Sequence, residues 1–106
     1  MADTLKRLAG PSQLASSSTT VYTVPAATTT VLRNIRVVNT TAGAVTFTMS
    51  IGADAAGTRI YNAYSVAAND LYDWSGCIVL GAAETLRAYA SAATSLTLTV
   101  SGVESA

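Results

Sequence analysis

Six carboxylates and one thiol are the side chains in this sequence best suited to catalysis or metal binding. The carboxylates are Asp3, Asp54, Asp70, Asp73, Glu84 and Glu104. A glycosidase needs two such acids on either side of a deep cleft, and a chain of 106 residues leaves little room for one. A calcium site needs six or more oxygen ligands, and the loop around Asp54 lacks the spacing of a calcium-binding loop. We therefore interpret the acids as solvated side chains that cap turns.

Histidine is absent, and Cys77 is the single cysteine. Histidine is the usual general base near neutral pH, so catalytic triads and cysteine–histidine pairs are excluded. Zinc sites of the ordinary kinds are excluded as well. Cys77 begins the apolar run Cys77–Leu80, and we expect a buried core thiol there. We predict a protein that is not an enzyme, with no catalytic residue, metal or cofactor.

Charged side chains make up only 11% of the sequence, and the six basic residues balance the six acidic ones. A typical soluble protein has about 25% charged residues. Nucleic-acid-binding proteins usually carry a basic patch, whereas only Lys6 and Arg7 are adjacent here. The apolar runs are too short to cross a membrane, and the N-terminus shows no secretory signal. We expect neither a nucleic acid nor a membrane as partner.

Low charge also bears on self-association. A neutral surface with few charges is poorly protected against binding copies of itself. We expect much of it to pack on other subunits, and a Thr/Ser-rich surface that stays soluble alone is the alternative.

β-branched residues and period-two alternation dominate the chain, which predicts strands. The clearest are Val45–Ile51 and Leu96–Ser101, in which apolar residues alternate with Thr and Ser. Further strands are predicted at Thr20–Val24, Val31–Asn39, Arg59–Tyr61, Leu71–Trp74, Gly76–Leu80 and Leu86–Ala90. Short strands at this spacing favour an all-β fold, an antiparallel, jelly-roll-like β-sandwich of about eight strands. The turn at Asn39–Gly43 is expected to close a hairpin between its two flanking strands.

Residues 1–19 differ from the rest because they contain a Gly10-Pro11 break and a serine run. We predict an N-terminal arm over 1–19 and a β-sandwich domain over 20–106. Thr4–Ala9 has room for one helical turn before the break. Three spaced leucines, Leu5, Leu8 and Leu14, suit docking either on a neighbouring subunit or on the chain's own domain.

Four aromatic residues, Tyr61, Tyr64, Tyr72 and Trp74, fall within fourteen positions. Tyrosine and tryptophan are enriched at interfaces because one end is apolar and the other polar. Intrachain packing, a subunit interface and carbohydrate contact all remain open. The residues predicted for an interface are Leu5, Leu8, Leu14, Tyr61, Tyr64 and Tyr72.

Several segments together give the chain a family resemblance. They are Tyr22–Ala26, Asn34–Thr41, Ser50–Ile60, Asp73–Gly76 and Val100–Glu104. In their order they resemble small virion structural proteins of tailed bacteriophages. The resemblance implies a β-sandwich subunit on the outside of the particle, a head decoration (cement) protein or a tail-associated one. It also implies a homo-oligomer, expected to be a trimer, made in the bacterial cytoplasm and built into the virion.

The partners that follow from this resemblance are further copies of the chain and the major capsid protein or tail proteins. No catalytic residue carries over from the family. The alternative is a receptor- or carbohydrate-binding module on the tail. Such a module would use the Tyr/Trp cluster with Asp54, Asp70 and Asp73 at the loop ends.

Overall fold

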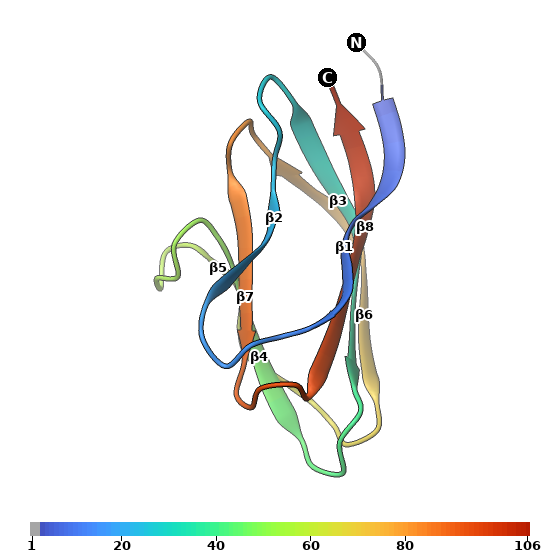
Figure 1. The fold of residues 1–106 in the computed structure, drawn as a ribbon, viewed down its shortest axis with the longest axis vertical. Helices are drawn as coiled ribbons and strands as arrows, with labels where there is room; N and C mark the ends of the chain where they lie inside the picture. Colours follow the sequence, from blue (N-terminus) through green and yellow to red (C-terminus); the bar gives the residue numbers. More distant parts are fainter. Residues whose placement is uncertain (1–2) are drawn as a thin grey trace.

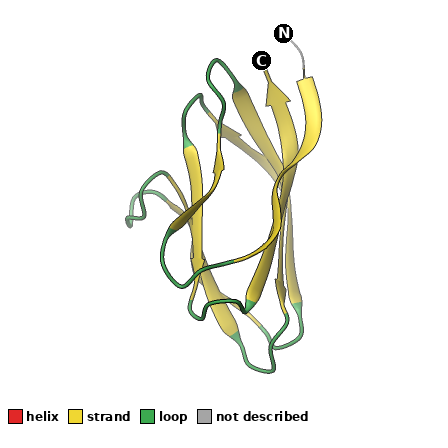
Figure 2. Ribbon diagram, viewed as in Figure 1, coloured by secondary structure: helices red, strands yellow, loops and turns green. Residues whose placement is uncertain are grey.

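The computed structural model describes residues 3–106, which form eight β-strands joined by loops (Figure 1, Figure 2). The strands are β1 (Asp3–Gln13), β2 (Thr19–Thr23), β3 (Thr29–Asn39), β4 (Val45–Ile51), β5 (Arg59–Val66), β6 (Leu71–Leu80), β7 (Thr85–Ala90) and β8 (Leu96–Ser105). Within this described range there is no helix of the length and apolarity needed to cross a membrane.

The strands form two four-stranded sheets in which every neighbouring pair is antiparallel. Sheet A has the order β1-β8-β3-β6, and sheet B has the order β2-β7-β4-β5. Only β4 and β5 are neighbours both in sequence and in a sheet, so every other connection crosses between the sheets (Figure 1). This strand order is that of an eight-stranded jelly roll, and it confirms the predicted all-β sandwich.

The core lies between the inner faces of the two sheets, as the alternating strands predict. On β8, Leu96, Leu98 and Val100 are fully buried. On β4, Phe47 and Met49 are buried opposite them in sheet B. The period-two alternation of both segments therefore identified their buried faces correctly.

Two sequence expectations about β-strand connections are wrong. Leu71–Trp74 and Gly76–Leu80 are one continuous strand, β6. The turn at Asn39–Gly43 leads from sheet A to sheet B instead of closing a hairpin. The buried Asn39 side chain shapes this crossing, because its Nδ2 donates to Gly43 O (2.9 Å) and to Val66 O (3.0 Å).

The N-terminal segment belongs to the sandwich. Residues 3–13 form β1, which pairs with β8 at the edge of sheet A, so the helical turn for which Thr4–Ala9 has room does not form. Leu14 is 2% exposed, and its N–H donates to Leu96 O (2.9 Å). Of the three leucines in residues 1–19, Leu8 and Leu14 dock on the chain's own domain, whereas Leu5 is 79% exposed. Met1 and Ala2 lie outside the described residues.

Candidate interaction surface

An apolar row crosses all four strands on the outer face of sheet A. Its members are Leu5 on β1, Val103 on β8, Val31 on β3 and Val79 on β6. Each lies directly opposite the next in the strand register: Leu5 faces Val103, Val103 faces Val31, and Val31 faces Val79. Directly opposed residues in antiparallel strands have Cβ atoms about 4.5–5.5 Å apart, so the row is one contiguous stripe.

The burial pattern shows that this row faces away from the core. Successive side chains of a strand point to opposite faces, and the neighbours of Val31, Thr30 and Leu32, are fully buried. Leu5 is 79% exposed and Val79 is 59% exposed, while Val31 and Val103 are half-buried. Large apolar side chains exposed side by side mark interaction sites more often than scattered ones do.

Arginines border the apolar row on one side. Arg7 lies opposite Ser101, one outward position from Leu5, and Arg33 follows Leu32 at a register shift of β3. Both are exposed, and neither forms a hydrogen bond or ion pair with another residue in the range 3–106. An apolar stripe with two unpaired cations suits a protein surface of opposite charge.

The other end of this face carries a paired charge. Asn34 Nδ2 donates to Asp73 Oδ1 (2.8 Å), and Arg36 Nη2 lies 3.4 Å from Asp73 Oδ2. The hydrogen bond from Asn34, assisted by Arg36, holds the pKa of Asp73 below its usual range. Beyond this pair, Val38 lies opposite the exposed Leu71.

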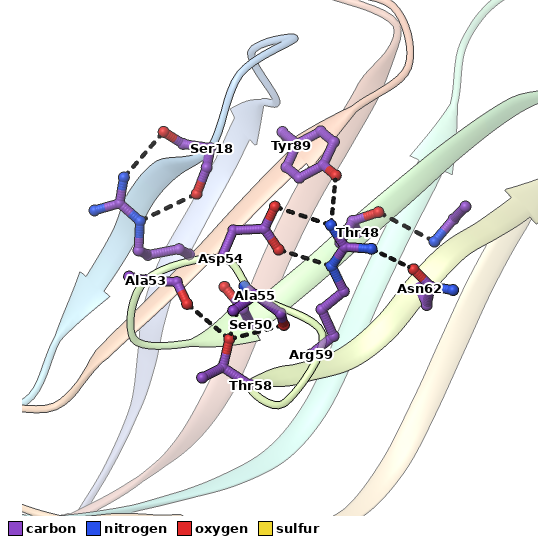
Figure 3. Close-up of polar contacts among 12 residues, drawn as sticks. Ser18, Thr48, Ser50, Ala53, Asp54, Ala55, Thr58, Arg59, Asn62 and Tyr89 are labelled. Carbon is purple, nitrogen blue, oxygen red and sulfur yellow. Dashed lines mark hydrogen bonds and ion pairs between the residues drawn. The ribbon is translucent and has the colours of Figure 1, made fainter.

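The outer face of sheet B differs because its arginines are engaged in hydrogen bonds (Figure 3). The loop between β4 and β5 stands out from the sandwich (Figure 1), and Asp54 within it accepts hydrogen bonds from Arg59 Nε (2.8 Å) and Nη2 (3.1 Å). These bonds lower the pKa of Asp54. Arg59 also donates to Asn62 Oδ1 (2.6 Å), and Arg87 donates to Ser18 Oγ (3.1 Å). The outer face of sheet B is therefore polar, and its two arginines form hydrogen bonds within the chain.

Three of the four predicted aromatic residues pack around Phe47 on the side of the sandwich where β5 and β6 form the sheet edges. Phe47 has ring centroids 5.1 Å from Tyr61, 5.8 Å from Tyr64 and 6.0 Å from Tyr72. The Tyr61 and Tyr72 hydroxyls lie 3.0 Å apart and link the two sheets. Burial, together with this contact, raises the pKa of Tyr61. Only Tyr64, 44% exposed, is open to a partner.

The fourth aromatic residue, Trp74, and two of the three predicted leucines pack on or in the core, and the third leucine is exposed. Trp74 packs against the core and lies over Gly76, where a Cβ would meet its indole ring. Leu5 is exposed and belongs to the apolar row. Leu8 packs over Gly102, and Leu14 is a core residue, so its predicted place at a surface contact is corrected.

Cys77 is exposed, so the expectation of a buried core thiol is wrong. The reason is its place on β6, an edge strand whose outward side chains face solvent. Of the loop-end acids, Asp70 accepts from its neighbour Leu71 N (2.8 Å) and Glu84 accepts from Gly81 N (2.5 Å), as expected of turn-capping residues.

A hydrogen bond from a tyrosine hydroxyl to a carboxylate joins the two sheets near the end of the sandwich. Tyr22 of sheet B donates to Glu104 of sheet A, and Lys6 Nζ lies 3.2 Å from Glu104 Oε1. The Tyr22 hydroxyl also lies 2.8 Å from Thr30 Oγ1. Burial and the neighbouring carboxylate raise the pKa of Tyr22 to about 12, and the Tyr22 hydroxyl lowers that of Glu104.

A hollow of about 280 Å³ opens between β1 and β2 at the opposite edge of the sandwich. Residues 12–15 and 19–21 line it with Ala88, and none of these side chains is charged. No group of three or more acidic, cysteine or histidine side chains gathers within residues 3–106. The hollow therefore offers neither an acid–base pair nor a metal-ligand set.

The chain matches no protein-family model, no curated protein and no solved structure.

Proposed function

We propose that this protein is a structural subunit of a tailed-bacteriophage virion, acting as a decoration protein that binds copies of itself and the particle surface. The observation that carries the proposal is the apolar row from Leu5 to Val79 across sheet A. A stripe of four apolar side chains on a neutral, sparsely charged chain suits burial against another protein. The phage assignment itself comes from the sequence resemblance.

The two outer faces suit different roles in such a subunit. Sheet A combines the apolar row with Arg7 and Arg33, and we assign it to the contact with the particle, on the major capsid protein or a tail protein. Sheet B keeps its arginines paired with Asp54, Ser18 and Asn62. Such satisfied charges gain little from a partner, so we place sheet B toward solvent.

A carbohydrate-binding module on the tail is the second candidate, and the tyrosine cluster is the feature that would serve it. The hydroxyls of Tyr61 and Tyr72 bond to each other, which leaves Tyr64 as the single well-exposed ring. Sugar recognition needs polar groups that converge on a pocket, and the hollow lies at the other edge of the sandwich. The structural role is therefore the better supported of the two.

The test is the copy number of the protein in purified particles of the phage that carries its gene, measured by quantitative mass spectrometry. A copy number of the order of the major capsid protein supports head decoration. A handful of copies would support the tail-module alternative, and complete absence would refute a virion role. The resemblance implies a trimer, and the mass of the protein in solution distinguishes that trimer from a dimer.

A further inference from the structure

The sandwich has four edge strands, and three of them carry features that discourage pairing with another chain. Free strand edges pair with other strands unless bulges, prolines, lysines or short length prevent it. β1 contains Pro11 and Lys6 and has two register shifts against β8. β2 has five residues and one shift. β5 has two shifts and a left-handed backbone at Ala63 (φ 48°).

β6 is the exception among these edges. It has ten residues, contains neither proline nor lysine, and pairs with β3 alone. Its single charge, Asp73, is engaged with Asn34 and Arg36 on β3. One register shift interrupts its pairing with β3. At this shift Gly76 and Cys77 lie opposite Arg33 alone, and Ser75, Gly76 and Cys77 are all exposed. Trp74 and Ile78, on either side of the shift, both pack on the core, so Leu71, Ser75 and Val79 share the outward face.

The exposed apolar residues of β6 are placed symmetrically. Leu71 is 49% exposed and Val79 is 59% exposed. Both point outward, and Ser75 lies midway between them along the strand. A two-fold axis places the same surface patch on both subunits, so a strand that is symmetric about its centre can pair with itself.

We propose that β6 pairs antiparallel with β6 of a second copy about a two-fold axis at Ser75. Leu71 of each copy then lies opposite Val79 of the other, Ser75 lies opposite Ser75, and Asp73 lies opposite Cys77. The inference deepens the proposed function by naming the self-association surface, and it rests on that function.

Other positions of the two-fold axis are worse. An axis at Asp73 would bring two carboxylates directly opposite each other, which is destabilising. An axis at Cys77 would leave Leu71 without a strand residue opposite it, because β6 ends at Leu80. With the axis at Ser75 the two Asp73 side chains are four residues apart along the strands, about 13 Å, where solvent ions screen their repulsion.

The pairing also continues the apolar row. The row ends at Val79 on the edge of sheet A, and across the axis Leu71 of the second copy comes next. Leu71 in turn lies opposite Val38 in its own sheet. Two four-stranded sheets thereby become one eight-stranded sheet, with two apolar rows on its outer face.

The experiment uses engineered disulfides in the full chain. Ser75→Cys in a Cys77→Ser background places one thiol at the axis, where opposed Cα atoms are about 4.5–5.5 Å apart, within the range that a disulfide spans. The matched control is Asp73→Cys in the same background, on the same face of the same strand. In the proposed dimer its thiols are about 13 Å apart, too far for a disulfide.

At low micromolar concentration and under mild oxidation, we expect the Ser75→Cys protein to form about tenfold more covalent dimer than the Asp73→Cys protein. Circular dichroism confirms that both variants fold. Equal cross-linking of both variants, or none in the Ser75→Cys protein, would overturn the β6 contact. The copy number in particles is measured on the wild-type protein, without these thiols. A failed cross-linking experiment is therefore distinguishable from a failure of the proposed function.

Discussion

Leu71 and Val79 lie at the two ends of β6 on the same outward face, equally distant from Ser75. Leu71 faces Val38, and Val79 faces Val31. Each therefore ends an apolar stretch of sheet A at the free edge of that sheet. This relationship links the two functional claims, because the row that we assign to the particle surface stops at the strand that we assign to self-association.

A charge at the end of β6 should dissociate the oligomer. Val79→Lys buries an unpaired ammonium against Leu71 of the second copy, whereas an exposed site tolerates such a change within about 0.5 kcal/mol of stability. We expect the variant to fold normally and to run as a monomer in size exclusion with light scattering. Thr23→Lys, at an exposed position on the edge of sheet B, is the control and should keep the wild-type mass. If the two variants had the same mass, the role of Val79 would be refuted.

Removing the far end of the apolar row should weaken particle binding without changing self-association. Leu5 lies on β1, at the other edge of sheet A from β6. Burial of a leucine side chain contributes about 1.5–3 kcal/mol, so Leu5→Ser should lower affinity for particles roughly tenfold to a hundredfold. Leu5→Met keeps an apolar surface and should bind nearly as wild type. Both affinities are measured by binding each fluorescently labelled variant to particles that lack this protein. An affinity of Leu5→Ser equal to that of the wild type would contradict the assignment of sheet A to the particle contact.

Substitutions of Leu5 and Leu14 should differ in their effect on stability, because Leu5 is exposed and Leu14 is buried. Leu14 is 2% exposed within the main cluster, and a buried Leu→Ala change costs about 2–5 kcal/mol. Leu14→Ala should lower the free energy of unfolding in urea by about 3 kcal/mol, and Leu5→Ala should leave it nearly unchanged. Equal stabilities would mean that residues 1–19 behave as a separate arm.

The strands that sequence analysis located best are those with strict alternation. Leu96–Ser101 and Val45–Ile51 alternate so regularly that their buried faces follow directly. Cys77–Leu80 is a continuous apolar run, and such a run does not tell which side chains face solvent. Cys77 is exposed because β6 lies at the edge of sheet A, and this position depends on the order of the strands.

Long-range pairing explains the remaining differences. β1 is a strand because it pairs with β8 near the other end of the chain, and the Gly10-Pro11 break obscured it locally. The turn at Asn39–Gly43 reads like a hairpin, but which sheet receives the next strand depends on all eight strands. The apolar row has no local signal, since its four residues are brought together only by the register of sheet A.

The contact between Tyr22 and Glu104 should make the stability of the fold depend on pH in both the acidic and the alkaline range. The pKa of Glu104 is lowered in the folded protein. The stability that ionised Glu104 contributes is therefore present above its unfolded pKa, and it is lost as the pH falls through the lower pKa of the folded state. The folded pKa of Tyr22 is raised to about 12. Its contribution is therefore complete below about pH 10 and is lost as pH rises toward 12.

Tyr22→Phe tests this contact between the sheets. The hydroxyl bonds a carboxylate, and such hydrogen bonds contribute about 1.5–3 kcal/mol, so the variant should lose about 1.5 kcal/mol at neutral pH. Urea unfolding from pH 3 to pH 11 should show a flatter profile for the variant than for the wild type. Parallel profiles would show that the contact does not stabilise the fold.

The mass of the protein in solution tests self-association through β6 most directly. Size exclusion with light scattering, run over a range of concentrations, should give twice the 10.8 kDa chain mass for the wild type and the single-chain mass for Val79→Lys. A trimer would contradict the two-fold contact while leaving a homo-oligomeric subunit in place. A wild-type monomer at every concentration would contradict self-association itself.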